Sequence, residues 1–255
     1  MGTVRVDVRG AVRVLVIERP EVHNCVDPAT AIAIGEAIDA FAGDAEAHVL
    51  VVTGEETAAF CTGADLRAAD GLLSHAYAER GSPLGFGRLD PGKPTIAAIE
   101  GYCFAGGMEL AAWCDVRVAA AGATFGALNR RFGVPFIDGG TQRFPRLVGT
   151  GNALYVVETG ARFDAERARA MGFVQEVVPD GQALARALEL AERIAAYPNQ
   201  GAIRADRASI LDPEALDAGI LRESERGRPT TADAGMAAGL RAFDEGRRPQ
   251  PPEAR

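Results

Sequence analysis

The 255-residue chain lacks any apolar run of the roughly 18 residues that a membrane-spanning helix needs. Its first residues lead directly into a strand-like alternation, without the apolar centre of a signal peptide. A dense basic surface is lacking too, because the formal net charge is −8, and binding to nucleic-acid phosphates requires such a surface. We therefore expect a cytoplasmic protein with neither a membrane nor a nucleic acid as its partner.

The chain has few cysteines, and their positions exclude two kinds of site. None of the four has the spacing of metal ligands, so we expect no metal. Without an export signal there is little reason for disulfides, and we expect small buried apolar side chains at Cys25, Cys61, Cys103 and Cys114. No histidine lies near Cys61 or Cys103 in the sequence, which disfavours a Cys/His nucleophile.

The most informative stretch that is present reads GYCFAGGMEL, at 101–110. It follows a run of branched and small apolar residues at 94–100, which predicts a buried strand. Gly106 and Gly107 then open a predicted helix, whose first N–H groups are unpaired and carry partial positive charge. Glu109 follows within the first turn. The pattern is typical either of an oxyanion site beside a carboxylate or of tight helix packing with an ordinary first-turn glutamate.

A second stretch of the same kind favours the oxyanion site. Residues 60–66 read FCTGADL, follow a strand predicted at 48–54 and lead into another helix. One N–H group from each stretch would give an oxyanion hole with two donors. Each such donor typically contributes about 3 kcal/mol to transition-state stabilisation.

These two stretches resemble the paired loops of the crotonase family, also called the enoyl-CoA hydratase/isomerase superfamily. Four further segments resemble the family's motifs in the same order, at 18–24, 139–143, 159–160 and 170–179. The combination is specific for the family and less so for the reaction. The resemblance implies an α/β fold, with a crotonase-like core of repeated β-β-α turns (the ClpP/crotonase fold) and a C-terminal helical trimerisation region.

The resemblance also implies a division of the chain and an assembly. We expect a crotonase-like acyl-CoA-binding core at 1–200, a C-terminal helical region at 201–247 and a disordered tail at 248–255. The implied assembly is a homotrimer, or a hexamer formed as a dimer of trimers. Periodicity alone indicates only a mixed α/β order of elements.

Residue-by-residue matching places the family's functional groups on this chain. The N–H groups of Ala64 and Gly106 fall at the oxyanion hole, and Glu109 falls at the first catalytic glutamate. The implied substrate is an acyl-CoA, so coenzyme A enters as part of the thioester and no permanently bound cofactor is expected. The residues expected at the coenzyme A portion are Val22, His23, Ala64, Asp65, Leu66, Arg67 and Gly106.

The chain departs from the family's hydratases at the second glutamate, where it has Asn129. An asparagine can orient a water molecule but cannot exchange a proton near neutral pH. Asp138 lies close to where dienoyl-CoA isomerases and dihydroxynaphthoyl-CoA synthases carry a functional aspartate, and it is our candidate for a second acid/base group. The alternative for Asp138 is a turn or N-cap aspartate that bonds to the amide of Gly140 or Thr141.

Three functional hypotheses follow. The favoured one is an enoyl-CoA hydratase that adds water to a 2-enoyl-CoA, with Glu109 and Asp138 as the acid/base carboxylates. The second is an enoyl- or dienoyl-CoA isomerase, or another enzyme of CoA-thioester enolate chemistry. The third is a non-catalytic acyl-CoA-binding protein that has lost turnover with Asn129.

Several local signals predict the elements around this site. Two strand-like runs flank Gly10 and predict a hairpin. Asp27 and Pro28 predict the N-cap and first turn of a helix. A strand is expected at 173–178, followed by helices to about residue 243.

Two segments are expected to form the wall of the acyl pocket. The first, 72–92, contains several glycines and predicts a mobile loop or a broken helix. The second is 132–137, which contains two phenylalanines that could line an apolar site or belong to the core.

Overall fold

The computed structural model describes residues 3–72, 74, 80, 82–212 and 245. Within these residues the strands form two sheets, of six and four strands. The six-stranded sheet has the order β1 (Val4–Arg9), β2 (Val12–Ile17), β3 (Val49–Gly54), β5 (Thr95–Ile99), β7 (Val116–Ala120) and β10 (Glu176–Val178). The four-stranded sheet has the order β4 (Ala59–Cys61), β6 (Tyr102–Phe104), β8 (Thr124–Gly126) and β9 (Arg162–Asp164).

The chain places one strand of each successive pair in each sheet. The pairs are β3 with β4, β5 with β6, and β7 with β8, and the first strand of each pair belongs to the six-stranded sheet. Pairing is parallel throughout these repeats, and only the hairpin of β1 with β2 and the edge pair of β8 with β9 are antiparallel among the described strands. The predicted hairpin and the predicted repeated turns are therefore both present.

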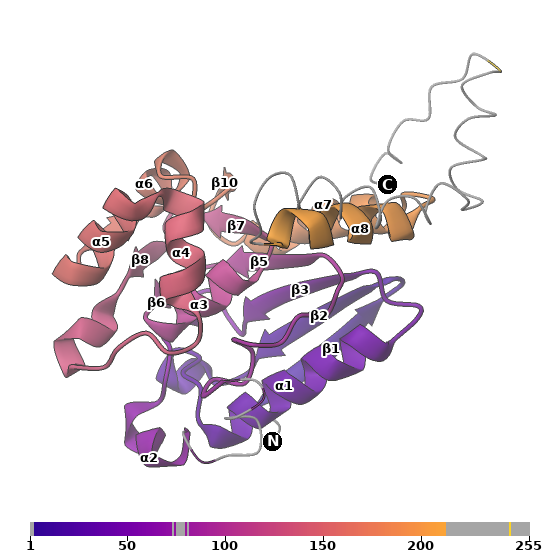
Figure 1. Cartoon of the computed structure of the whole chain (residues 1–255). Helices are drawn as coiled ribbons and strands as arrows, with labels where there is room; N and C mark the ends of the chain where they lie inside the picture. The colour runs from indigo at the N-terminus through magenta and orange to yellow at the C-terminus, as the bar shows by residue number, and fades with distance from the viewer. Residues whose placement is uncertain (1–2, 73, 75–79, 81, 213–244, 246–255) are drawn as a thin grey trace.

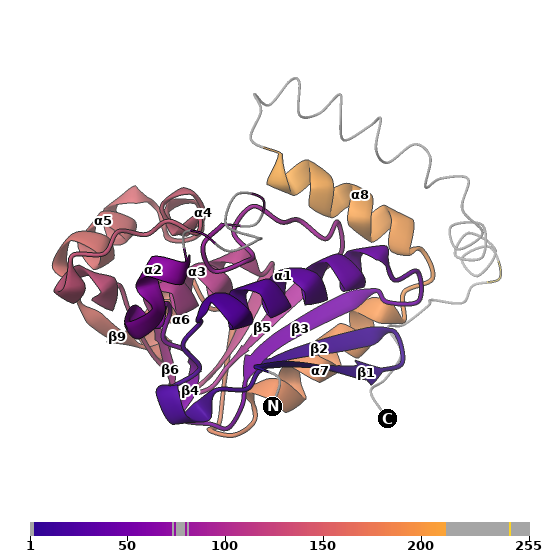
Figure 2. The ribbon, with the colours of Figure 1, turned by 90° about the horizontal axis from the view of Figure 1, so that it is seen from below.

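Helices cover both faces of the six-stranded sheet (Figure 1, Figure 2). Helix α1 (Pro28–Gly43) packs on one face through Ile34, Ile38 and Phe41, and α7 (Ala183–Ala195) packs on the other. Because both faces are buried, strands such as β3 and β5 read as continuous apolar runs rather than as alternating ones. The predicted start of α1 is confirmed, since Asp27 Oδ1 accepts a hydrogen bond of 2.8 Å from Thr30 N.

The remaining helices lie around the four-stranded sheet and at the C-terminal end. They are α2 (Ala69–Leu72), α3 (Gly106–Trp113), α4 (Gly140–Val148), α5 (Thr150–Thr159), α6 (Ala165–Ala170) and α8 (Gln200–Leu211), with short 3₁₀ turns η1 (Pro20–Val22), η2 (Leu66–Ala68) and η3 (Leu128–Phe132). Helices α3 and α4 pack side by side (Figure 1). In the described part of the chain, no helix has both the length and the apolar character that crossing a membrane requires.

The structure differs from the prediction for the strand at 173–178, and it describes only part of the predicted C-terminal region. The strand expected at 173–178 is shorter, because the N–H groups of Phe173 and Val174 bond to Ala168 O and close the end of α6. Of the C-terminal helical region, the structure describes α8 and not residues 213–244, and the tail at 248–255 lies outside the described residues. The division at residue 200 therefore stays a prediction.

The segment 82–92 is better packed than a mobile loop would be. Leu84 and Phe86 are buried in the main core, and Leu89 lies at its edge. Residues 73, 75–79 and 81 of the same predicted loop lie outside the described residues. The described part of this segment therefore packs against the main hydrophobic core.

Candidate active site

All residues predicted for the site line one cavity of about 860 Å³, which is within the usual size of small-molecule sites. They come from four segments far apart in the sequence: Val22, His23, Ala64, Asp65, Leu66, Arg67, Gly106, Glu109 and Asp138. Both segments predicted as pocket wall contribute, through Leu72, Pro83 and Leu84 and through all residues of 132–137. Phe132 is largely exposed at this cavity and Phe136 is buried beside it.

Two backbone amides lie close together in this wall. A Cβ atom built on Gly63 would lie 2.7 Å from Gly106 N, and one built on Gly106 would lie 3.7 Å from Ala64 N. Gly63 has φ +92°, so glycine is required there both for this close approach and for the backbone conformation. The two predicted loops therefore meet at Ala64 and Gly106.

The N–H groups of Ala64 and Gly106 have no acceptor among the residues that the structure describes. The neighbours of Ala64 bond to Val26, since Val26 N donates to Gly63 O and Asp65 N donates to Val26 O, each at 2.8 Å. In a parallel bridge of this kind, the N–H of Ala64 itself points away from Val26. Gly106 begins α3, where a helix leaves its N–H groups unpaired.

The turn into α3 is held in an uncommon backbone conformation. Ala105, its N-cap, has φ 50° and ψ −122°, a region that costs a non-glycine residue about 1–3 kcal/mol. Hydrogen bonds hold it there, because its N–H donates to Gly126 O and its carbonyl accepts from Met108 N and Glu109 N. Strain of this kind is common at functional sites.

Glu109 is buried on the first turn of α3, with 3% of its surface exposed. Its Oε1 accepts hydrogen bonds of 2.9 Å from the N–H groups of Asp138 and Gly140, at the start of α4. Burial is the largest cause that raises the pKa of Glu109, and the negative charge of Asp138 adds to it, whereas these N–H groups lower it, so that the resulting pKa is about 8. A carboxyl group with such a pKa can both take up and release a proton near neutral pH.

Asp138 is buried beside Glu109, but its carboxylate does not cap a helix. Its Oδ1 accepts a hydrogen bond of 2.5 Å from Ser82 Oγ and one of 2.8 Å from Leu84 N. The N-cap of α4 is Gly139, and the N–H of Gly140 bonds to Glu109 instead. The alternative interpretation of Asp138 as a capping aspartate is therefore wrong, whereas its acid/base role stays a prediction.

Asn129 lies in the same cavity and is 7% exposed. Its Nδ2 donates to Val134 O at 2.7 Å, which turns Oδ1 the other way. That Oδ1 is buried and has no hydrogen-bond donor among the described residues. Asn129 therefore has a buried acceptor atom without a protein donor among the described residues, next to the cavity that the residue lines.

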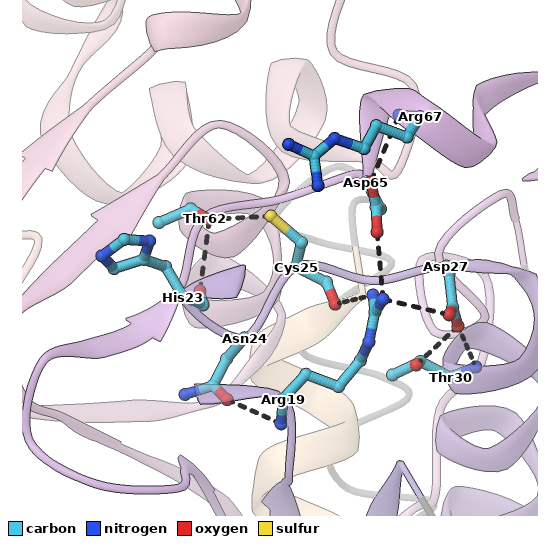
Figure 3. A network of polar contacts seen from close by, with 9 residues as sticks. All are labelled: Arg19, His23, Asn24, Cys25, Asp27, Thr30, Thr62, Asp65 and Arg67. Atoms are coloured by element: carbon cyan, nitrogen blue, oxygen red, sulfur yellow. Dashed lines mark hydrogen bonds and ion pairs between the residues drawn. The ribbon is translucent and has the colours of Figure 1, made fainter. Parts of the chain in front are cut away.

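A network around Arg19 connects two segments that contribute residues to the cavity wall, at Cys25 and at Asp65 (Figure 3). Its guanidinium donates to Cys25 O at 2.7 Å and to Asp65 Oδ2 at 3.0 Å, and it pairs with Asp27 at 3.2 Å. Arg67, the cation expected near coenzyme A, is exposed, and its N–H donates to Asp65 Oδ1. Sequence reasoning missed Arg19 as a site residue, although it lies within a motif that the resemblance includes.

The cysteines are all free, and three are buried as expected. The expectation is wrong for Cys25, which is partly exposed and lines the cavity with its Sγ 3.0 Å from Thr62 Oγ1. Sequence reasoning also missed Ser82, because nothing in its own neighbourhood indicates a partner on another segment.

The chain is similar to several known proteins over most of its length. A family model described as enoyl-CoA hydratase/isomerase matches residues 7–251. The chain is 34% identical over 225 residues to a crotonyl-CoA hydratase of Syntrophomonas wolfei, covering 87% of this chain and 84% of that protein. It is 35% identical over 187 residues to a carnitinyl-CoA dehydratase of Salmonella typhi, covering 72% and 71%. The solved structure of an enoyl-CoA hydratase from Mycobacterium tuberculosis H37Rv superposes with a TM-score of 0.90 at 32% identity, covering 98% of each chain.

Proposed function

Because the chain belongs to the enoyl-CoA hydratase/isomerase family, as its sequence predicted, we propose that it is an enzyme that adds water to the double bond of a 2-enoyl-CoA. The N–H groups of Ala64 and Gly106 would hold the thioester oxygen, and Glu109 would transfer the proton. One observation carries this proposal: a single cavity joins two neighbouring unpaired N–H groups to a buried carboxyl group with a pKa raised to about 8.

One part of the cavity wall suits the coenzyme A portion of such a substrate. Val22, His23 and Leu66 line it together with the exposed Arg67, whose charge can pair with a phosphate. Coenzyme A would enter only as part of the thioester. The assembly implied by the family, a homotrimer or a dimer of trimers, is part of the same proposal, and analytical ultracentrifugation tests it.

The proposed reaction begins with polarisation of the thioester. Two N–H donors withdraw electron density onto the carbonyl oxygen, each contributing about 3 kcal/mol in the transition state, and this makes the β-carbon electrophilic. Ionised Glu109 takes a proton from water while the water oxygen bonds to the β-carbon and the π electrons move toward the carbonyl oxygen. The resulting enolate then takes the same proton from Glu109 at its α-carbon, which restores the carboxylate.

Asn129 would orient the water in this reaction. Its Oδ1, which has no donor among the described residues, would accept one hydrogen of the water once a small movement of the side chain exposes it, and the other hydrogen would face Glu109. The amide cannot exchange a proton, so Glu109 would carry the proton in both halves of the reaction. Asp138, predicted as a second acid/base group, would not transfer the proton in this mechanism, because its Oδ1 accepts from Ser82 Oγ and Leu84 N. It would contribute its charge, which favours the protonated form of Glu109.

The amide at position 129 also supports a second candidate, double-bond isomerisation. Moving a double bond requires one group that carries a proton from one carbon to another, and it requires no oriented water. The names of the similar proteins, a crotonyl-CoA hydratase and a carnitinyl-CoA dehydratase, favour hydration or its reverse.

The experiment that tests the proposal uses crotonyl-CoA. We expect the absorbance of the conjugated thioester to fall on addition of the enzyme, with a product heavier by one water in mass spectrometry. Glu109→Gln should lower kcat by about 10²–10⁴-fold, because it removes the proton carrier. Equal rates for the variant and the wild type would contradict the assignment. A product of unchanged mass would indicate isomerisation, and binding without turnover of any acyl-CoA would indicate a binding protein.

A further inference from the structure

The buried Ser82 side chain forms hydrogen bonds that connect two segments that line the cavity. Its Oγ donates to Asp138 Oδ1 at 2.5 Å and accepts a hydrogen bond of 2.8 Å from Gly87 N. Its side chain is 1% exposed, and its φ of 90° is uncommon for a residue other than glycine. These hydrogen bonds hold Ser82 in a conformation that it would not adopt by its own preference.

Two further contacts complete the connection between segments 82–87 and 138–143. Leu84 N donates to the same Oδ1 of Asp138 at 2.8 Å. The guanidinium of Arg143 donates to Gly87 O at 2.6 Å and to Asp138 O at 3.2 Å. The 82–87 segment is therefore bonded at one end to Asp138, before α4, and at the other to Arg143, within α4.

The connection fixes the position of Leu84 against the oxyanion loop. Leu84 is buried and lines the cavity, and its Cδ1 lies 2.3 Å from where a Cβ on Gly106 would be. The leucine side chain thus covers Gly106, whose N–H is a proposed donor to the thioester oxygen. A group held at this place limits the room beside the carbonyl and α-carbons of a bound acyl chain.

We propose that Asp138 and Ser82 are positioning residues, which hold Leu84 over Gly106 so that the cavity accepts acyl groups without a substituent on the α-carbon. This inference rests on the proposed function, because it takes the thioester oxygen to lie at Gly106 N. Asp138 then acts through its hydrogen bonds: its N–H holds Glu109 Oε1, and its carboxylate holds the wall.

The test compares kcat/KM for crotonyl-CoA with kcat/KM for 2-methylcrotonyl-CoA, which differs by one α-methyl group. The wild type should prefer crotonyl-CoA. Leu84→Ala and Ser82→Ala should each reduce this preference about tenfold, mainly through 2-methylcrotonyl-CoA. Ser74→Ala is the matched control, because Ser74 is exposed and its hydroxyl contacts only Gly71 O within the described residues.

Two variants of Asp138 separate positioning from proton transfer. Asp138→Asn keeps an oxygen that can accept from Leu84 N and Ser82 Oγ, so it should retain the preference. Because it removes a negative charge beside Glu109, it should also shift the rise of kcat/KM to lower pH. Asp138→Leu removes that acceptor and should lose the preference. A kcat for Asp138→Asn as low as that of Glu109→Gln, in protein with an unchanged thermal transition, would overturn the inference.

The remaining outcomes are also decisive. If Ser82→Ala does not fold, Leu84→Val still changes the wall, and an unchanged preference in Leu84→Ala and Leu84→Val would overturn the proposal. If the wild type turns over neither substrate, the hydratase proposal fails by itself. Calorimetry with butyryl-CoA and 2-methylbutyryl-CoA then tests the role of Leu84. The dissociation constant for 2-methylbutyryl-CoA divided by that for butyryl-CoA should be smaller in Leu84→Ala than in the wild type. An unchanged ratio would refute the proposal.

Discussion

The surroundings of Glu109 shift its pKa in opposite directions. Burial removes water from the carboxylate, and Asp138 adds a negative charge nearby, so both raise its pKa. The N–H groups of Asp138 and Gly140 stabilise the ionised form and limit the rise. The resulting pKa of about 8 leaves both forms populated near neutral pH. Because the amide of Asn129 cannot exchange a proton, Glu109 would have to carry out both proton transfers.

The first prediction concerns the pH dependence of the rate. We expect kcat/KM for crotonyl-CoA to rise with pH and to level off above pH about 8, because the ionised form of Glu109 takes the proton from water. A pKa of about 8 leaves roughly a tenth of Glu109 ionised at pH 7, so the plateau should be about tenfold higher than the value at pH 7. Initial rates in buffers of constant ionic strength measure this profile. A rate that is constant, or that falls, between pH 7 and about 9 would contradict the prediction.

At the scale of elements, the start of α4 holds the carboxylate that α3 supplies. Gly140 makes this approach feasible, because a Cβ there would lie 2.7 Å from Glu109 Cγ. The helix start also places partial positive charge beside Oε1, which favours an anion there. The strained turn at Ala105 and the close approach at Gly140 therefore hold the two ends of one site, on two adjacent helices.

The second prediction tests this helix contact. Gly140→Ala should displace the Glu109 side chain and lower kcat by about 10–100-fold, since small misplacements of a reacting group are costly. The free energy of unfolding should fall by about 1–3 kcal/mol, because the added methyl group overpacks a buried site. Steady-state kinetics and urea denaturation measure the two effects.

The control for this variant is Gly151→Ala on α5, where a Cβ would meet nothing within 4 Å. We expect wild-type kinetics for this variant. Equal kcat for Gly140→Ala and Gly151→Ala would show that Glu109 tolerates the added methyl group.

At the scale of the whole molecule, the repeated β-β-α turns bring distant segments to one cavity. Residues near 23, 64, 106 and 138 come from four separate parts of the chain and meet at its wall. The fold thereby buries an ionisable group that an unfolded chain would expose to water. Burying this group lowers the stability of the folded protein when the group is ionised. The direction of the pH dependence follows from the raised pKa of Glu109.

The third prediction concerns this cost. Folding raises the pKa of Glu109 from 4.5 to about 8, so between these values the folded state binds a proton that the unfolded state has released. Stability should therefore fall as pH rises from about 5 to about 9, by at most about 5 kcal/mol from this group. Glu109→Gln removes the effect and should be more stable than the wild type at pH 9 but not at pH 5.

Thermal unfolding at several pH values measures the difference, with roughly 2–4 °C expected for each kcal/mol in a protein of this size. Glu36→Gln provides the control, because Glu36 is exposed on α1. If Glu109→Gln and Glu36→Gln show the same pH dependence, Glu109 is not the source of the loss.

The sequence by itself determined the family, the repeated turns and the loops that contain Ala64, Gly106 and Glu109. The loops depend on local order, because an apolar run predicts a strand and a glycine pair before a glutamate predicts a helix start. The order of the motifs along the chain identified the family, and the resemblance to the family implied the repeated turns. The predicted N-cap at Asp27 is confirmed for the same reason, since its partner Thr30 lies only one turn away.

The tertiary structure alone decided which side chains meet across these segments. Asp138 accepts from Ser82 and Leu84, and Glu109 bonds to the start of α4, although no local pattern connects these residues. Cys25 likewise lies at the cavity because Arg19 connects its loop to Asp65. The physical reason is that periodicity and capping depend on neighbours within a turn or two, whereas a buried hydrogen bond depends on how whole elements pack.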